Sequence, residues 1–303
     1  INNPDLKSQK TTNYEIGFKQ TLTSSSALTI NAFYREMRDM IQYTRVAYAF
    51  PKEYNTYGNI DFGTVKGLSL AYEMRRTKNV SFNANYTMQF ADGSGSNSTS
   101  GANIVNSEQP NLRTTLPLDY DQRHNLTASM DFRYSSGKRY NGPVLGGKQI
   151  LANMGVNLVA TAGSGTPYSR QLNATRAAMF GINNRAYLEG SYNGSRLPWT
   201  YRMDMRVNKS FDLTWGEEED VKSASMNFYL QVQNLLNTAN IVDVYQFTGN
   251  ANDDGYLTTA VGVSDIEDQV NPQSFVDMYT VKLNDPSNYT RPRTVRLGVT
   301  LDF

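Results

Sequence analysis

Residues 80–90 read VSFNANYTMQF and alternate strictly between apolar and polar side chains. A period of two residues is typical of a β-strand that presents one apolar and one polar face. The run also has the ~9–11 residues with which a tilted strand crosses a membrane. The apolar positions are Val80, Phe82, Ala84, Tyr86, Met88 and Phe90. The stretch therefore predicts a two-faced strand that is long enough to span a bilayer.

The same alternation recurs along the chain, with Phe33 as a clear exception. It predicts about nine long antiparallel strands, near 11–22, 27–44, 62–76, 80–91, 123–134, 152–163, 200–213, 224–235 and 292–303. A soluble β-sandwich also alternates, because one face of each sheet packs on a core. These runs are longer than the usual ~5–6 residues of a soluble strand, and their apolar faces are almost free of charge. The pattern favours an all-β transmembrane barrel.

The composition removes several other classes of protein. The 303 residues carry 29 Lys+Arg against 28 Asp+Glu, so there is no basic excess for binding nucleic acid. The absence of Cys excludes disulfides, thiolate metal sites and cysteine nucleophiles. No apolar run approaches the ~18–20 residues of a membrane helix. Twenty Tyr residues and a polar average composition fit a transmembrane β-barrel instead.

The connections between the predicted strands alternate in length. Segments 23–26 and 76–79 are short and 214–223 is moderate, whereas 45–61, 92–122, 164–199 and 236–291 are long. Only segment 135–151 has an awkward length for a short turn. Outer-membrane barrels have short periplasmic turns and long external loops, so a periplasmic C-terminus puts every long segment outside. We expect the Gly/Ser/Asn-rich residues 92–112 to be mobile and residues 273–283 to form a short amphipathic helix on the rim or on another loop.

Nine is an odd number, whereas bacterial single-chain barrels usually have an even number of strands. An open nine-stranded sheet would also leave two unpaired edges, which lipid does not tolerate. We therefore expect the chain to need either earlier strands or complementary chains. Its last residues, Arg296-Leu297-Gly298-Val299-Thr300-Leu301-Asp302-Phe303, resemble the β-signal read by the outer-membrane assembly machinery. In that interpretation Arg296, Gly298, Leu301 and Phe303 belong to an edge strand that is offered for β-augmentation. The alternative is an ordinary edge strand that ends in Phe.

Several multi-residue motifs resemble those of TonB-dependent transporters. They are NPDLKSQKTTNYEIGFKQ (3–20), FGTVKGLSLAYEMR (62–75), DYDQRHNLTASMDFRY (119–134) and RMDMRVNKSFDL (202–213). Gln9 stands where the family more usually has Glu. Segments 161–171, 229–258 and 285–303 look like the Oar-like branch, whose members carry a carboxypeptidase-regulatory-like domain, and SusC-like importers are the nearest alternative.

The resemblance implies a 22-stranded barrel in the outer membrane of a Gram-negative bacterium. Residues 1–303 would then supply the C-terminal segment of the barrel, and the plug domain and earlier strands would be absent from this chain. The implied function is energised passage of a bulky ligand. The implied partners are outer-membrane lipid, the missing strands and plug, TonB through the plug, and the assembly machinery, with a surface lipoprotein or a secretion-complex subunit as a further partner.

Two rival functions stay open. One is a scaffold barrel in a secretion, assembly or adhesion complex without transport of its own, and the other is a soluble β-sandwich adhesin. An enzyme is not expected, because no G-x-S-x-G elbow or supported Ser/His pair is present.

The candidate site residues are few. His124, the single His, is expected to be a strand-entry residue bonded to a neighbour such as Asp121, since a lone imidazole builds no metal site. Asn250, Asn252, Asp254 and Gly255 resemble a calcium loop, but Val261 replaces the bidentate Glu of such a loop. A solvated turn is therefore expected there, and no cofactor is predicted beyond this calcium alternative.

Further residues are assigned by face. Aromatic girdles at the membrane boundaries are expected to include Tyr14, Tyr34, Tyr72, Tyr134 and Tyr201. The inward-facing charges are expected to pair with one another and with a plug; they are Arg202, Asp204, Arg206, Asp131, Arg133 and Arg296. The acidic run Glu217, Glu218, Glu219 and Asp220 is expected to be solvated, with docking of a periplasmic partner as the alternative.

Overall fold

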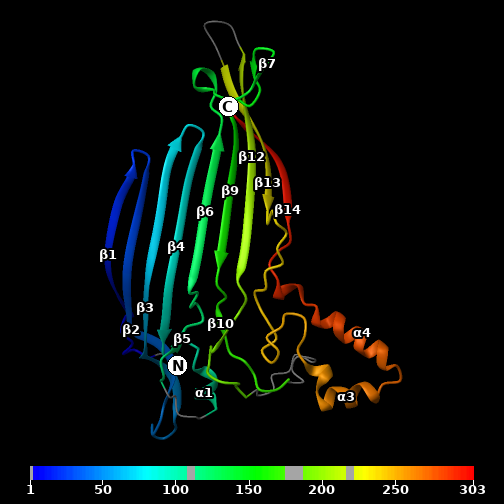
Figure 1. Cartoon of the computed structure of the whole chain (residues 1–303). Helices are drawn as coiled ribbons and strands as arrows, with labels where there is room; N and C mark the ends of the chain where they lie inside the picture. The colour runs from blue at the N-terminus through cyan, green and yellow to red at the C-terminus, as the bar shows by residue number, and fades with distance from the viewer. Residues whose placement is uncertain (1–2, 108–112, 175–186, 216–221) are drawn as a thin grey trace.

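A computed structural model of the chain describes residues 3–107, 113–174, 187–215 and 222–303. Its main body is one curved antiparallel sheet (Figure 1). The long strands, in their order across the sheet, are β1 (Lys10–Thr23), β2 (Ser26–Val46), β3 (Tyr54–Thr77), β4 (Val80–Gly93), β6 (His124–Arg133), β9 (Met154–Gly163), β12 (Thr200–Trp215), β13 (Lys222–Gln233) and β14 (Thr294–Asp302). The nine predicted strands are confirmed. Among the described residues, β1 pairs only with β2 and β14 only with β13.

The connections gather at two ends of the sheet (Figure 1). The short connections and the C-terminus lie at one end, together with β7 (Val144–Leu145) and its partner β8 (Lys148–Gln149). The N-terminus and the long connections lie at the other end, which we call the rim. The predicted gathering of the long connections at one end is therefore confirmed, although the connection between β6 and β9 at the other end is also long.

The predicted loop at 45–61 is wrong. Strands β2 and β3 continue to pair as far as Val46 and Tyr54, so the connection is only residues 47–53. The extension is rich in Thr, Tyr and Val, which favour strands. Tyr43 and Tyr57 face each other across it with ring centroids 5.6 Å apart, a cross-strand contact that stabilises the pair. The result is a hairpin that projects beyond the rim.

A β-bulge marks the base of this hairpin. The register shifts between Met37 and Met40, and Asp39 takes a left-handed conformation with φ of 55°. Opposite the bulge, the Asn59 amide donates to the carbonyls of Lys7 and Asp39, at 2.8 Å each, and its oxygen accepts from the Lys7 N–H at 2.7 Å. One side chain thus ties the segment that leads into β1 to the base of the hairpin.

The expected mobility of residues 92–112 is wrong for residues 92–107, and residues 108–112 lie outside the described part of the chain. Residues Ala102–Asn106 form helix α1, and β5 (Leu116–Pro117) pairs with the end of β4. Leu118 is buried against Val65 and Ala91. This segment folds back over the polar face of the sheet and caps it at the rim.

The rest of the rim consists of short elements. They are β10 (Pro167–Tyr168), paired with β11 (Ser195–Arg196), and then η2 (Tyr256–Thr258), α3 (Ala260–Glu267), α4 (Pro272–Leu283) and η3 (Pro286–Asn288). The remaining short helix, η1 (Gly137–Arg139), lies at the opposite end of the sheet. The predicted helix at 273–283 is confirmed as α4. The Asn271 side chain caps it by accepting from the Ser274 N–H at 3.1 Å, and Pro272 follows the cap. No helix in the described ranges is long and apolar enough to cross a membrane.

Phe33, the residue that breaks the alternation, has a structural partner. It lies directly opposite Gly67 on β3, on the polar face, and packs against the buried group formed by Val65, Ala91 and Leu118. A Cβ on Gly67 would lie 2.6 Å from the Phe33 ring and 2.3 Å from the Met88 carbonyl oxygen. The glycine therefore makes room for the ring.

We predict that Gly67→Ala destabilises the folded sheet by about 1–3 kcal/mol, because neither the strand backbone nor the Phe33 ring can retreat freely. The measurement is the midpoint temperature at which the protein loses its folded mobility in unheated gel electrophoresis. Gly58→Ala is the matched control in the same strand, since its Cβ would meet only side-chain methyl groups, those of Thr44 at 3.3 Å and Ile60 at 3.5 Å. Equal midpoints for the two variants would refute the steric explanation.

Candidate functional site

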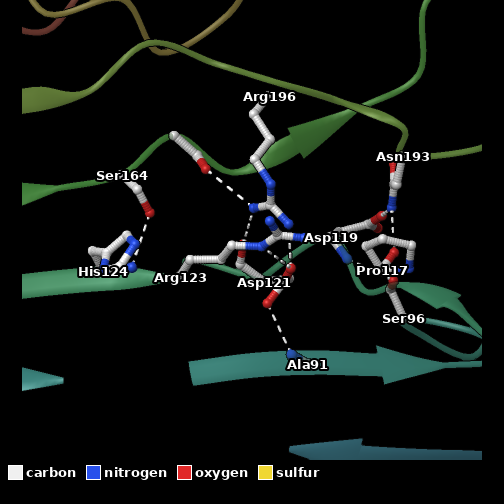
Figure 2. A network of polar contacts seen from close by, with 11 residues as sticks. Ala91, Ser96, Pro117, Asp119, Asp121, Arg123, His124, Ser164, Asn193 and Arg196 are labelled. Atoms are coloured by element: carbon white, nitrogen blue, oxygen red, sulfur yellow. Dashed lines mark hydrogen bonds and ion pairs between the residues drawn. The ribbon is translucent and has the colours of Figure 1, made fainter. Parts of the chain in front are cut away.

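The rim is organised around the buried carboxylate of Asp121, which is 1% exposed (Figure 2). One oxygen accepts from the Ala91 N–H of β4 at 2.8 Å, and the other pairs with the Arg196 guanidinium of β11. Arg196 also donates to the Asp121 carbonyl at 2.6 Å, and the Arg123 Nε lies 3.8 Å from the same carboxylate. A buried ion pair that is hydrogen-bonded on several sides fixes the geometry of its elements. This one joins segment 164–199 to the sheet.

Asn193 makes a second connection between the same segments (Figure 2). Its amide donates to the Pro117 carbonyl at 2.9 Å and to the Asp119 carboxylate at 2.7 Å. The Asp119 N–H in turn donates to the Ser96 hydroxyl at 2.9 Å. The two long segments 92–122 and 164–199 are therefore cross-linked into one body.

Gln42 attaches this body to the projecting hairpin. Its side chain is 1% exposed; the amide donates to the Asp61 carboxylate at 2.8 Å and to the Asn97 carbonyl at 3.1 Å. Asp61 also accepts from the Ser94 hydroxyl at 2.9 Å. Sequence reasoning missed Gln42, Asp61 and Arg196, because nothing in a local pattern shows which distant loop a polar side chain meets.

An open hollow of about 550 Å³ lies between the hairpin and α1. It is lined by Tyr43, Arg45, Lys52, Glu53, Tyr54, Asn55, Val105 and Asn106. The Tyr48 N–H donates to the Glu53 carboxylate at 3.2 Å, and Arg45 pairs with it; both contacts lower the pKa of Glu53. Beside the hollow, Tyr48 and Phe50 at the hairpin tip are 96% and 97% exposed. The hollow thus offers fixed charges of both signs beside free aromatic rings.

The charges predicted to lie on the polar face do pair in part. Arg202 pairs with Asp204 at 2.8 Å, and Asp131 lies 4.0 Å from Arg133. Asp131 also pairs with Arg76, which the sequence interpretation did not include. The Arg206 guanidinium instead lies over the Tyr229 ring, 4.5 Å from its centroid.

The expected partner of His124 is wrong. His124 begins β6 as predicted, but its Nδ1 lies 2.8 Å from the Tyr86 hydroxyl, because Asp121 is taken by Arg196. The solvated turn expected at 250–255 is also wrong, since Asp254 is 2% exposed. The Tyr279 hydroxyl and the Tyr256 N–H both donate to the Asp254 carboxylate. Burial and this hydrogen bond raise the pKa of Tyr279.

In the segment that resembles a calcium loop, the side-chain oxygens of Asn250 and Asn252 accept hydrogen bonds from the protein itself. The Asn250 side chain accepts from the Asn252 N–H at 3.0 Å, and Asn252 accepts from the Tyr289 hydroxyl at 2.7 Å. Within the described ranges, no three His, Asp or Glu side chains are grouped as a metal site would need. The run Glu217 to Asp220 lies outside these ranges.

The residues of the proposed β-signal all lie at the C-terminal end of the sheet. Arg296, Gly298 and Leu301 are in β14, and Phe303 follows it. Gly298 lies directly opposite Tyr229, and a Cβ there would be 2.4 Å from the tyrosine ring. Arg206, Tyr229 and Gly298 thus interlock three neighbouring strands. A role in assembly stays a prediction.

The predicted girdle tyrosines lie near both ends of the strands. Tyr14 and Tyr34 face each other with centroids 6.2 Å apart, and Tyr201 lies at the rim end of β12. Tyr72 lies two residues from the Met74 that pairs with Ser26 at the short turn, and Tyr134 follows the end of β6. Their contact with headgroups stays a prediction.

The sequence profile of the TonB-dependent receptor-like β-barrel matches residues 1–235, which is most of the chain. The chain belongs to this family. It is accordingly an outer-membrane receptor segment from a Gram-negative bacterium, and membership of a receptor family fits the expectation that it is not an enzyme. No curated protein matches the sequence.

Three solved structures are similar in fold. The pyoverdine-bound FpvA of P. aeruginosa matches with a TM-score of 0.50 and 10% identity over 98% of this chain and 27% of that one. The outer membrane transporter YddB of Escherichia coli matches with a TM-score of 0.49 and 15% identity over 79% of this chain and 30% of that one. The ferric-catecholate import receptor Fiu of E. coli K12 matches with a TM-score of 0.48 and 14% identity over 99% and 28%. The chain thus spans less than a third of these TonB-dependent barrels.

We predict that Asp121→Ala opens the rim of this family member. Loss of the carboxylate leaves Arg196 and the Ala91 N–H without their partner, which costs about 3–5 kcal/mol for a buried pair. Amide exchange at Ala91 and at residues 195–197 should accelerate at least about tenfold in the intact protein. Asp131→Asn, near the far end of the β6 strand that follows Asp121, is the control and should change exchange little, because its ion pair is partly exposed. Unchanged exchange in Asp121→Ala would contradict the organising role of this carboxylate.

Proposed function

We propose that this receptor segment belongs to an importer that takes up a bulky ligand at the rim and passes it through the barrel with energy supplied by TonB. The observation that carries the proposal is the rim itself. Two long segments and the projecting hairpin are cross-linked by buried polar contacts at Asp121, Asn193 and Gln42, and they support an open hollow of about 550 Å³. Fixed polar groups around such a volume suit a ligand site, for which ~300–1,000 Å³ is usual.

The partners follow from this proposal. A plug domain would fill the polar face between the ion pairs of β6 and β12, and TonB would act on the barrel through that plug. The earlier strands would pair with the free edges of β1 and β14, since hydrocarbon does not tolerate unpaired backbone groups. We also propose the Oar-like branch for this chain, with the SusC-like importers as the alternative; the motifs at 161–171, 229–258 and 285–303 support it.

A second candidate function is a scaffold for another surface protein. It is favoured by the helices α3 and α4, which project away from the sheet (Figure 1). The apolar residues Met278 and Val281 of α4 are exposed, and so is Val270, which lies between the two helices. Apolar side chains on a projecting element are typical of a surface that contacts a partner.

One experiment separates the two functions. Wild-type cells, cells without the gene and cells without TonB are grown in the same medium, and the compounds left in the supernatant are measured by mass spectrometry. Import predicts that at least one large compound is depleted by the wild type alone. A scaffold predicts unchanged depletion together with an altered set of surface or secreted proteins in the gene deletion. Depletion that persists without TonB would refute energised import.

We predict that Tyr48→Ser with Phe50→Ser reduces this uptake at least about tenfold, because exposed aromatic rings beside a site supply a large part of binding free energy. The measurement is the initial rate of depletion at low ligand concentration, with the amount of barrel in the membrane checked in parallel. Val144→Ser with Leu145→Ser is the matched control, since it removes two exposed apolar side chains at the opposite end of the strands. An equal rate in both variants would exclude the hairpin tip as a ligand contact.

A further inference from the structure

Aromatic rings gather on the apolar face of the sheet, close to the rim. Tyr86, His124, Trp199 and Tyr201 form a stack with successive centroid distances of 6.1, 5.5 and 6.2 Å and interplanar angles of 14–18°. Strand β9 lies beneath the stack, between β6 and β12, and carries the small Ala162 at this height, with Ser164 directly after its end. Only Tyr201 of this stack was predicted as a girdle residue. The stack marks the level at which the apolar face ends.

Two cations lie beside Phe90, four residues beyond Tyr86 along β4 toward the rim. Lys66 is paired in register between Tyr34 on β2 and Phe90 on β4. Because Gly67 faces the Phe33 ring on the polar face, Lys66 must be on the apolar one. On the other side of Phe90, the Arg123 guanidinium lies over the ring, 5.3 Å from its centroid. Phe90 is therefore bracketed by two positive charges.

These charges are available to a ligand. Lys66 is exposed and makes no ion pair with the described residues. Arg123 shares Asp121 with Arg196, so the single carboxylate leaves one of the two guanidinium charges uncompensated. The other acids near this part of the face are Glu36, which pairs with Arg38 at 2.7 Å, and Asp92. The net charge of the side chains around Phe90 is therefore positive.

The position of Lys66 along its strand points to headgroup depth. Toward the short turns, the same face of β3 continues with the uncharged Leu68, Leu70, Tyr72 and Met74. A lysine costs about 2–4 kcal/mol at the bilayer midplane and about 0–1 kcal/mol near the interface. Lys66 thus stands at the first polar step beyond the apolar band, on the external side.

We propose that Lys66, Arg123, Phe90 and Tyr34 form a binding site for the phosphorylated saccharide headgroup of an outer-leaflet glycolipid. The two cations would hold a phosphate group through charge-assisted hydrogen bonds. The aromatic rings would contact the sugar, and the acyl chains would lie along Leu68 and Leu70. This apolar floor favours a lipid over a free phosphate, which would gain nothing from it. The inference depends on the outer-membrane location and not on import.

The test uses the intact protein in phosphatidylcholine nanodiscs that contain bisphosphorylated lipid A, with the bound fraction measured by native mass spectrometry. Lys66→Gln with Arg123→Gln should weaken lipid A binding at least about tenfold, which corresponds to about 1.4 kcal/mol. Lys78→Gln with Arg139→Gln is the matched control. It also removes two exposed positive charges, but at the short-turn end, and should leave the affinity unchanged.

Each further outcome decides the proposal. Lipid A without its phosphates should bind at least about tenfold more weakly to the wild type; equal binding would overturn the phosphate contact. Equal losses in the two double variants would show a non-specific charge effect and overturn the site. Displacement of lipid A by millimolar inorganic phosphate would show an anion site without lipid preference and overturn it too. If the double variant does not fold, single changes decide: Lys66→Arg should keep the affinity, Lys66→Gln should lose part of it, and equal affinities would overturn the role of the charge.

Discussion

The structure depends on one constraint, the pairing of backbone groups in a medium that offers no water. Within hydrocarbon each N–H and C=O needs a partner from the protein, and an antiparallel sheet supplies it strand by strand. The same pairing fixes a side-chain period of two, so lipid-facing and polar residues must alternate. A slip of one residue would reverse both faces of a strand. The faces, the connections at the two ends and the rows of aromatic rings across neighbouring strands all follow from this register.

Outside the bilayer the constraint is relaxed, because water is available as a hydrogen-bond partner. There, buried carboxylates hold the segments of the rim together. Asp121, Asp61 and Asp254 are each almost completely buried, and each accepts hydrogen bonds from groups distant in sequence. A buried charge is stable only when it is fully paired. These three positions therefore select one arrangement of segments that contain few apolar residues. The same physics explains why a Gly/Ser/Asn-rich stretch is folded against the sheet at residues 92–107.

The features that could be predicted from the sequence are those that local side-chain periodicity controls. The nine strands and the helix α4 follow from side-chain period and from a cap such as Asn271, because these signals lie within a few residues of one another. The first part of β3, residues 54–61, was missed because its hydrophobic alternation fades where lipid no longer demands it. The partners of His124 and Arg196 were missed for a different reason. They lie on strands or loops 38 and 75 residues away, and no pattern in one sequence reports which loop reaches which carboxylate.

The side chain of Asn59 has a mechanical consequence for the hairpin. One amide binds the backbone of the segment before β1 and the backbone of the bulge at Asp39. The paired strands beyond that bulge form a stiff arm of about six residues, or roughly 20 Å. The hydrogen bonds of Asn59 hold the base of this arm to the segment before β1, so the arm cannot change its direction unless these bonds break or that segment moves with it. The direction in which the arm projects from the rim is therefore set by the position of the chain that leads into β1.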